Sequence, residues 1–113
     1  MSTSVSGIGE LVATFQVEDT IALGDLVVLS DQQTVKKAQA EEELIGVCVS
    51  INGNYAGIQL KGGTVLNCQD TSLTVGYHPL KVLAENNIAK ADNGAHHLVV
   101  RVDNVNKIAE VIL

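Results

Sequence analysis

The stretch LIGVCVSINGNYAGIQL, residues 44–60, has the pattern of two β-strands joined by a tight turn. Its first run is rich in β-branched residues, Asn52-Gly53 follows directly, and Tyr55 opens a second apolar run. Asn-Gly accepts the positive φ angles of a type I′ turn, whose twist matches that of two paired strands. The stretch therefore predicts a β-hairpin and favours an all-β fold.

Further strands are expected on both sides of this hairpin, because apolar runs alternate with turns rich in Gly, Asn, Asp and Ser. The expected strands are 8–15, 26–29, 34–38, 64–68, 88–91, 97–105 and 108–113. A short helix is the alternative for residues 35–44, which contain good helix formers, and for residues 80–88, where apolar residues fall at helical spacing.

The hairpin recurs later in the chain. A shift of 53 residues lays 35–60 on 88–113 without a gap, and it lays residues 25–38 of the segment 22–38 over HPLKVLAENNIAKA, residues 78–91. Identical pairs under this shift are Lys37/Lys90, Ala38/Ala91, Val47/Val100, Val49/Val102, Ala56/Ala109 and Leu60/Leu113. The agreement indicates an internal structural repeat. The alternative is that two strand-rich halves agree because both alternate.

We interpret the repeat as two similar β-units, 8–60 and 61–113. Neither is large enough to bury its own apolar face, so we expect them to close on each other as one small β-barrel or sandwich. Residues 1–9 are rich in Ser, Thr and Gly and are expected to form a flexible N-terminal arm. Residues 10–113 then form a single β-domain.

The composition disfavours several classes of partner. With 7 basic and 13 acidic residues and only 3% aromatic residues, the chain repels phosphate and lacks platforms on which bases stack. We therefore expect no binding to nucleic acid or to an anionic membrane. No run approaches the ~18 apolar residues of a membrane span, and the start MSTSVSGIGE lacks the features of a signal peptide, so we expect the protein to stay in a cytoplasm.

Candidate metal-ligating residues are few. His96 and His97 are adjacent, so on a strand they point to opposite faces and are expected to be ordinary surface or interface histidines. A metal shared with His78 across the two halves is the alternative. The glutamates 41–43 are interpreted as a solvated edge, with a divalent cation as the alternative.

The remaining reactive residues also have structural interpretations. Cys48 and Cys68 have no metal-ligand spacing and are expected to be buried free thiols. Asp25 stands at the entrance to a strand, where a short carboxylate normally accepts backbone N–H bonds. We therefore expect no enzyme, no cofactor and no metal site.

The order of motifs in the first half resembles the head decoration, or capsid cement, proteins of tailed bacteriophages. In that family a strand enters through Gly-Asp, a second strand ends in Lys-Ala, and an Ile-Gly-Val strand leads into a hairpin that ends in a Lys-Gly turn. The corresponding positions here are Gly24-Asp25, 35–38, 45–47 and Lys61-Gly62. The similarity covers roughly residues 15–65; in the second half, Tyr77-His78-Pro79 replaces the expected Gly-Asp.

The resemblance implies a non-enzymatic virion protein, made in the bacterial host cytoplasm and bound to the outer surface of the expanded head. Its partners would be the major capsid protein, whose subunits it clamps together, and itself, commonly as a homotrimer. We expect contacts to the capsid or to another copy at Ser4, Val5, Ser6, Gly7, Ile8, Gly9 and Leu11; the alternative for this segment is a frayed terminus. The competing class of function is a cytoplasmic ligand-binding or adaptor β-barrel without catalytic activity.

Overall fold

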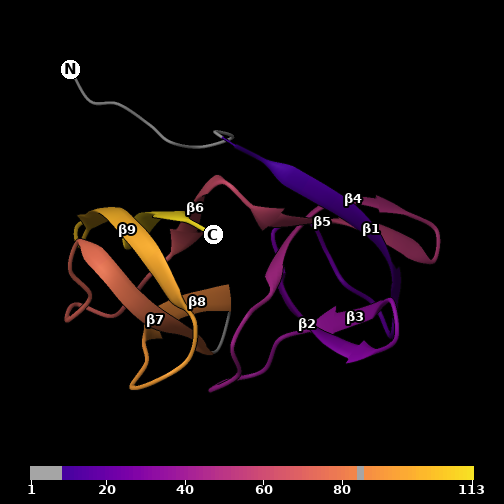
Figure 1. Ribbon diagram of the computed structural model, residues 1–113, viewed down its shortest axis with the longest axis horizontal. Helices are drawn as coiled ribbons and strands as arrows, with labels where there is room; N and C mark the ends of the chain where they lie inside the picture. Colours follow the sequence, from indigo (N-terminus) through magenta and orange to yellow (C-terminus); the bar gives the residue numbers. More distant parts are fainter. Residues whose placement is uncertain (1–8, 84–85) are drawn as a thin grey trace.

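The computed structural model describes residues 9–83 and 86–113, and in them the chain is built of β-strands (Figure 1). The ten strands are β1 (Leu11–Val17), β2 (Leu26–Asp31), β3 (Thr34–Lys37), β4 (Gly46–Asn52), β5 (Tyr55–Lys61), β6 (Gly63–Asn67), β7 (Gly76–Leu83), β8 (Asn87–Lys90), β9 (His96–Asp103) and β10 (Ile108–Ile112). The predicted all-β class is confirmed. The helical alternatives for 35–44 and 80–88 are wrong, because no α-helix forms in the described residues. The first segment holds the end of β3 and a loop, and the second holds parts of β7 and β8.

The first five strands close a barrel in the order β1-β3-β2-β4-β5, and β5 pairs back to β1. Two hairpins, β2–β3 and β4–β5, supply most of this pairing, and β1 joins them by running parallel to β3. Aliphatic side chains fill the interior, where Val27, Val35 and Ile58 are fully buried. The barrel therefore has a packed core of its own.

The turn of the β4–β5 hairpin lies one residue later than the Asn-Gly pattern predicts. Asn52 pairs with Tyr55, so Gly53 and Asn54 are the two turn residues. Gly53 has a positive φ of 61° and Asn54 does not, which is the pattern of a type II′ turn; type I′ needs a positive φ at both positions. The predicted hairpin is confirmed, and the predicted turn type is wrong.

The last five strands repeat the arrangement of the first five, because β6-β8-β7-β9-β10 is the same cyclic order as β1-β3-β2-β4-β5. Leu29 pairs with Val35 in the first barrel, and Val82 pairs with Ile88, 53 residues later, in the second. The two similar halves predicted from the sequence are therefore confirmed.

The shift between the halves is not constant. Cys48 pairs with Ile58 in the first barrel, and Val99 pairs with Val111 in the second, so β4 and β9 are related by 51 residues where β5 and β10 are related by 53. The loop between β9 and β10 is correspondingly longer than the turn between β4 and β5. The gapless alignment is therefore wrong over β4, because a slip of two residues preserves the alternation on which it rested.

Each half closes a barrel of its own, whereas the sequence predicted that the halves would close together on one. Five strands are enough to enclose a row of aliphatic side chains. The barrels still share a core: Leu26, Val28 and Val47 point out of the first barrel and are buried in one cluster with Val82 of the second. Val27, between two of them, belongs to the first barrel's interior. Both faces of β2 are therefore buried, and we call the shared cluster the seam.

Candidate interaction surfaces

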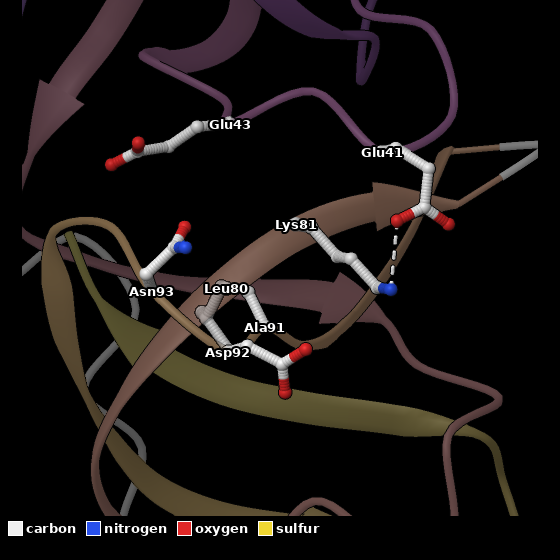
Figure 2. Close-up of a pocket in the computed structure, with 7 residues that line it drawn as sticks. All are labelled: Glu41, Glu43, Leu80, Lys81, Ala91, Asp92 and Asn93. Atoms are coloured by element: carbon white, nitrogen blue, oxygen red, sulfur yellow. Dashed lines mark hydrogen bonds and ion pairs between the residues drawn. The ribbon is translucent and has the colours of Figure 1, made fainter.

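Residues 39–43, between β3 and β4, fasten the first half to the second, and we call them the seam clip. Glu41 donates its backbone N–H to the carbonyl oxygen of Val82 (2.7 Å), and Val82 donates its N–H to the carbonyl oxygen of Glu42 (2.8 Å). Lys81, next to Val82 on β7, binds the Glu41 carboxylate at 2.8 Å (Figure 2). Two backbone hydrogen bonds and one ion pair therefore hold the seam clip against β7.

The three glutamates of the seam clip do not converge. Glu42 accepts the backbone N–H of Gln39 (2.7 Å), and Glu43 accepts the N–H of Ala95 (2.9 Å) from the other half of the chain. Figure 2 shows the Glu41 and Glu43 side chains pointing in different directions. No group of three or more His, Cys, Asp or Glu side chains that could hold a metal ion occurs in residues 9–83 and 86–113. The side chains of Glu41 and Glu43 therefore join the two halves, and the Glu42 side chain stabilises the seam clip itself.

A hollow of about 270 Å³ lies beside the seam clip. It is lined by Glu41, Glu43, Leu80, Lys81, Ala91, Asp92 and Asn93 (Figure 2). The hydrogen bond to Glu41 raises the pKa of Lys81, so this amine stays protonated near neutral pH and cannot serve as a nucleophile or a base. Most of the side chains that line this hollow are charged or polar, and they come from both halves of the chain.

Asp25 caps a turn, as the sequence predicted, and also joins the two barrels. Its carboxylate accepts the N–H of Ala22 (2.9 Å) and the side-chain amide of Asn86 (2.8 Å), which comes from the connection between β7 and β8. The Asn86 side-chain oxygen accepts the N–H of Leu26 in turn (3.2 Å). Asn86 adopts a left-handed φ of 60°, a conformation that asparagine tolerates well. The second barrel thus completes the hydrogen bonding of the first.

His78 and His97 face each other on β7 and β9, whereas His96 lies opposite Pro79 on the other face. The two adjacent histidines therefore point to opposite faces, as predicted. His78 Nε2 lies 3.2 Å from the hydroxyl of Thr74. His97 Nε2 is buried without a hydrogen-bond partner in the described part of the chain, and burial lowers the pKa of His97. His97 is accordingly neutral at pH 7.

Cys48 and Cys68 are free and buried, as predicted. Cys48 lies in the core of the first barrel, and Cys68 follows β6 in the core of the second. Burial raises the pKa of both thiols. Because the thiolate is the reactive form, neither cysteine is an activated nucleophile.

The outer surface of the first barrel carries an exposed patch, the β1–β5 face, which we define by the exposed residues Val12, Thr14, Ser50 and Tyr55 and by the buried Gly57 between them. Thr14, Gly57 and Ser50 lie opposite one another on β1, β5 and β4. Val12 is 42% exposed and Tyr55 is 50% exposed. A Cβ atom at Gly57 would clash with Ser50 Oγ and lie 3.3 Å from Val12 Cγ1. A shallow hollow of about 330 Å³, lined in part by Thr14 and Gly57, lies beside Tyr55.

Two of the predicted contact residues, Gly9 and Leu11, lie in the described part of the chain, and both are exposed. Leu11 begins β1 opposite Lys61 and adjoins the β1–β5 face. The others lie outside the described residues: Ser4, Val5, Ser6, Gly7 and Ile8. The sequence pattern did not single out Val12 and Tyr55, which are exposed on this face. The alternation along β1 signals an outward row, but it does not show that this row meets Tyr55.

No protein-family model matches the chain, and a search of the curated proteins finds no significant match. Among the described residues there is no helix with the length and apolar character needed to cross a membrane.

Proposed function

We propose that the chain is a structural protein of a tailed-bacteriophage virion, a decoration or cement protein that binds the outer surface of the expanded head. It would be made in the cytoplasm of the bacterial host, bind the major capsid protein as a homotrimer and stabilise the contacts between neighbouring capsid subunits. The starting point is the resemblance of residues 15–65 to that family. In this proposal the chain is not an enzyme and uses no cofactor.

The observation that carries the proposal is the β1–β5 face. An exposed aromatic residue beside a shallow hollow has the composition of a protein contact surface, where tyrosine is enriched. Tyr55 can bury a large ring at a small cost in conformational entropy, and the hollow beside Tyr55 can admit a side chain of the partner. Leu11 and Gly9 continue this surface toward the N-terminal arm. The arm and the face can therefore bind as one continuous surface.

The charge and the packing also support a structural role. A net charge of −6 keeps the chain away from packaged DNA and soluble at a high local concentration. Several weak contacts made by one oligomer add up to tight binding, because each later contact forms at a high effective concentration. The interior of the first barrel is filled by side chains such as Val27 and Ile58, which favours this role over the ligand-binding alternative.

The test is co-sedimentation of the purified chain with expanded, undecorated heads, with unexpanded heads as the control. Saturable binding to expanded heads alone, at a fixed ratio to capsid subunits, is expected. A Val12→Ser/Tyr55→Ser variant should bind at least about tenfold more weakly, the scale of a loss of about 1.4 kcal/mol. Val105→Ser is the matched control, because Val105 is 89% exposed on the second barrel. No binding to either form of the head would overturn the proposal.

The contribution of the arm is tested separately by removing residues 1–9. This truncation should leave the thermal unfolding of the barrels unchanged, since β1 begins at Leu11. It should lower the occupancy on expanded heads if Ser4 to Gly9 contact the capsid. Unchanged occupancy would show that the β1–β5 face binds without the arm.

A further inference from the structure

The second barrel has an edge that the first half of the chain covers. At Val82 on β7, the backbone N–H and C=O point away from β8 and bind the seam clip at Glu42 and Glu41. Val82 is 1% exposed as a result of this cover and of the surrounding core. The seam clip therefore closes the side of β7 that lies beyond its pairing with β9.

The first barrel has the same edge, and no described residue binds it as the seam clip binds Val82. Leu29 is the equivalent of Val82, because it pairs with Val35 as Val82 pairs with Ile88, 53 residues later. Leu29 is 55% exposed, although the three residues before it on β2 are buried.

The backbone groups of Leu29 face the uncovered side. The carbonyl oxygen of Val27 accepts the N–H of Ile45 on the side of β2 away from β3, and backbone groups two residues apart in a strand point the same way. The pairing of β2 with β4 covers Leu26 and Val27 and stops there. Within residues 9–83 and 86–113, no hydrogen bond reaches Leu29 from this side. We call the backbone and side chain of Leu29 the open edge.

The repeat also supplies an equivalent of the seam clip, the turn 92–96. Gly94 corresponds to Glu41 under the 53-residue shift, and both have left-handed φ angles, 114° and 74°. Residues 92–96 are all exposed. Ala95 binds Glu43 through its N–H, which leaves the N–H of Gly94 and the carbonyl oxygen of Ala95 without a hydrogen bond to any described residue. The equivalent groups in the seam clip are the N–H of Glu41 and the carbonyl oxygen of Glu42, and both bind Val82.

We propose that the turn 92–96 of a second copy of this chain binds the open edge, with the Gly94 N–H donated to the carbonyl oxygen of Leu29 and the Leu29 N–H donated to the carbonyl oxygen of Ala95. The second copy is the occupant because the chain already makes this contact once, between its own halves. Each copy carries one turn and one open edge, so the contact is head to tail, the kind that closes into rings.

The contact between copies is weaker than the contact within the chain. The seam clip adds the ion pair between Lys81 and Glu41, whereas the equivalent positions are Val28 and Gly94, which carry no charge. The association should therefore depend on protein concentration. It concerns the chain alone, so it can be measured without capsids, and its outcome is separate from that of the head-binding test.

Sedimentation velocity of the chain over a range of concentrations tests the proposal. The wild-type chain should form dimers and larger species as the concentration rises, whereas Leu29→Arg and Asn93→Arg should each remain monomeric. Val105→Arg, which adds the same charge at an exposed site of the second barrel, should associate like the wild type. Leu29→Pro removes the proposed donor without removing a β2–β3 hydrogen bond, because that N–H points away from β3, and it should also be monomeric.

A mixture of the two arginine variants is the decisive sample. The intact turn of Leu29→Arg can bind the intact open edge of Asn93→Arg, so an equimolar mixture should form a one-to-one dimer and nothing larger. A wild-type chain that stays monomeric up to its solubility limit would overturn the proposal. So would oligomers that survive in both arginine variants, or a mixture of these variants that stays monomeric.

Discussion

The two barrels share a strand order and a β-hairpin register but differ at equivalent positions. Ser50 faces Gly57 in the first barrel, and Arg101 faces Glu110 at the corresponding pair of the second. The first barrel has a separate core, whereas the core of the second continues into the seam and includes Leu26. The repeat thus preserves the arrangement of the backbone, whereas the side chains at equivalent positions of the two barrels differ. The first presents the exposed β1–β5 face, and the core of the second extends into its neighbour.

The largest loss of stability is expected from a substitution of Leu26, which packs in the seam between the two barrels. This side chain is completely buried and points from the first barrel into the seam, so Leu26→Ala should lower the free energy of unfolding by about 2–5 kcal/mol. Chemical denaturation measures the loss, and hydrogen exchange locates it. Exchange should become faster in β7 and β9 of the second barrel.

The matched control for Leu26 is its neighbour Val27. Val27 is equally buried but points into the first barrel, so Val27→Ala should speed hydrogen exchange in β2, β3 and β5 instead. If both variants gave the same pattern of exchange, the two barrels would form one cooperative unit and the contrast between their cores would have no energetic meaning.

The next effect is expected at Gly46, whose equivalent in the second barrel is His97. A Cβ atom at Gly46 would clash with the backbone carbonyl oxygen of Gln59, which cannot turn aside as a side chain can. Gly46→Ala should therefore cost about 1–3 kcal/mol of stability. His97→Ala, at the equivalent site, should cost less. Equal losses measured by thermal unfolding would mean that the two sites are not distinguished by backbone packing.

A smaller loss of stability is expected when the ion pair between Arg101 and Glu110 is broken. The Glu110 side chain is 5% exposed and the Arg101 side chain is 46% exposed, with 3.5 Å between Nη1 and Oε2. Arg101→Ala leaves the buried carboxylate without this partner and should cost about 1–2 kcal/mol, a value reduced because Arg101 reaches solvent.

The double variant Arg101→Ser/Glu110→Gly installs the pair of the first barrel in the second. Denaturant titration should show that the double variant is more stable than the sum of the two single losses predicts, because neither charge is left alone. Additive losses would indicate that the two side chains do not interact.

The smallest effect is a pH dependence that belongs to the second barrel alone. Burial holds the pKa of His97 below its ordinary value of 6.5, so the unfolded chain binds a proton more readily than the folded chain. The free energy of unfolding should therefore fall as the pH drops below 6.5, and this loss should be complete below the folded pKa. Glu43 opposes the shift by its charge, while His96 and Lys61 add to it.

Thermal unfolding of the wild type and of His97→Gln between pH 7 and pH 5 measures this contribution. The variant should lose most of the slope. Asp103, whose pKa is lowered mainly by the N–H of Asn106, contributes its own loss only below its ordinary value of 3.8. A slope that persists in His97→Gln would assign the titration to another group.

The hairpins and the repeat could be predicted because each depends on local signals, namely alternation, β-branched runs and turn residues. The two barrels and the seam could not be predicted. The one sequence signal of the seam is the run of consecutive apolar residues Leu26, Val27 and Val28. Three buried residues in a row mean that both faces of a strand are covered. The sequence does not say what covers the second face. The β1–β5 face could not be predicted for a similar reason, since the sequence does not show which residues of β1, β4 and β5 lie side by side and line the hollow beside Tyr55.

The two cysteines allow the barrels to be followed separately by chemical labelling. Each core holds one thiol, Cys48 in the first and Cys68 in the second, and each is 1% exposed. A thiol reagent can therefore reach either sulfur only after its barrel has opened, and peptide mass analysis distinguishes the two products. The ratio of the two labelling rates gives the order in which the barrels open, in the wild-type chain and without an added probe.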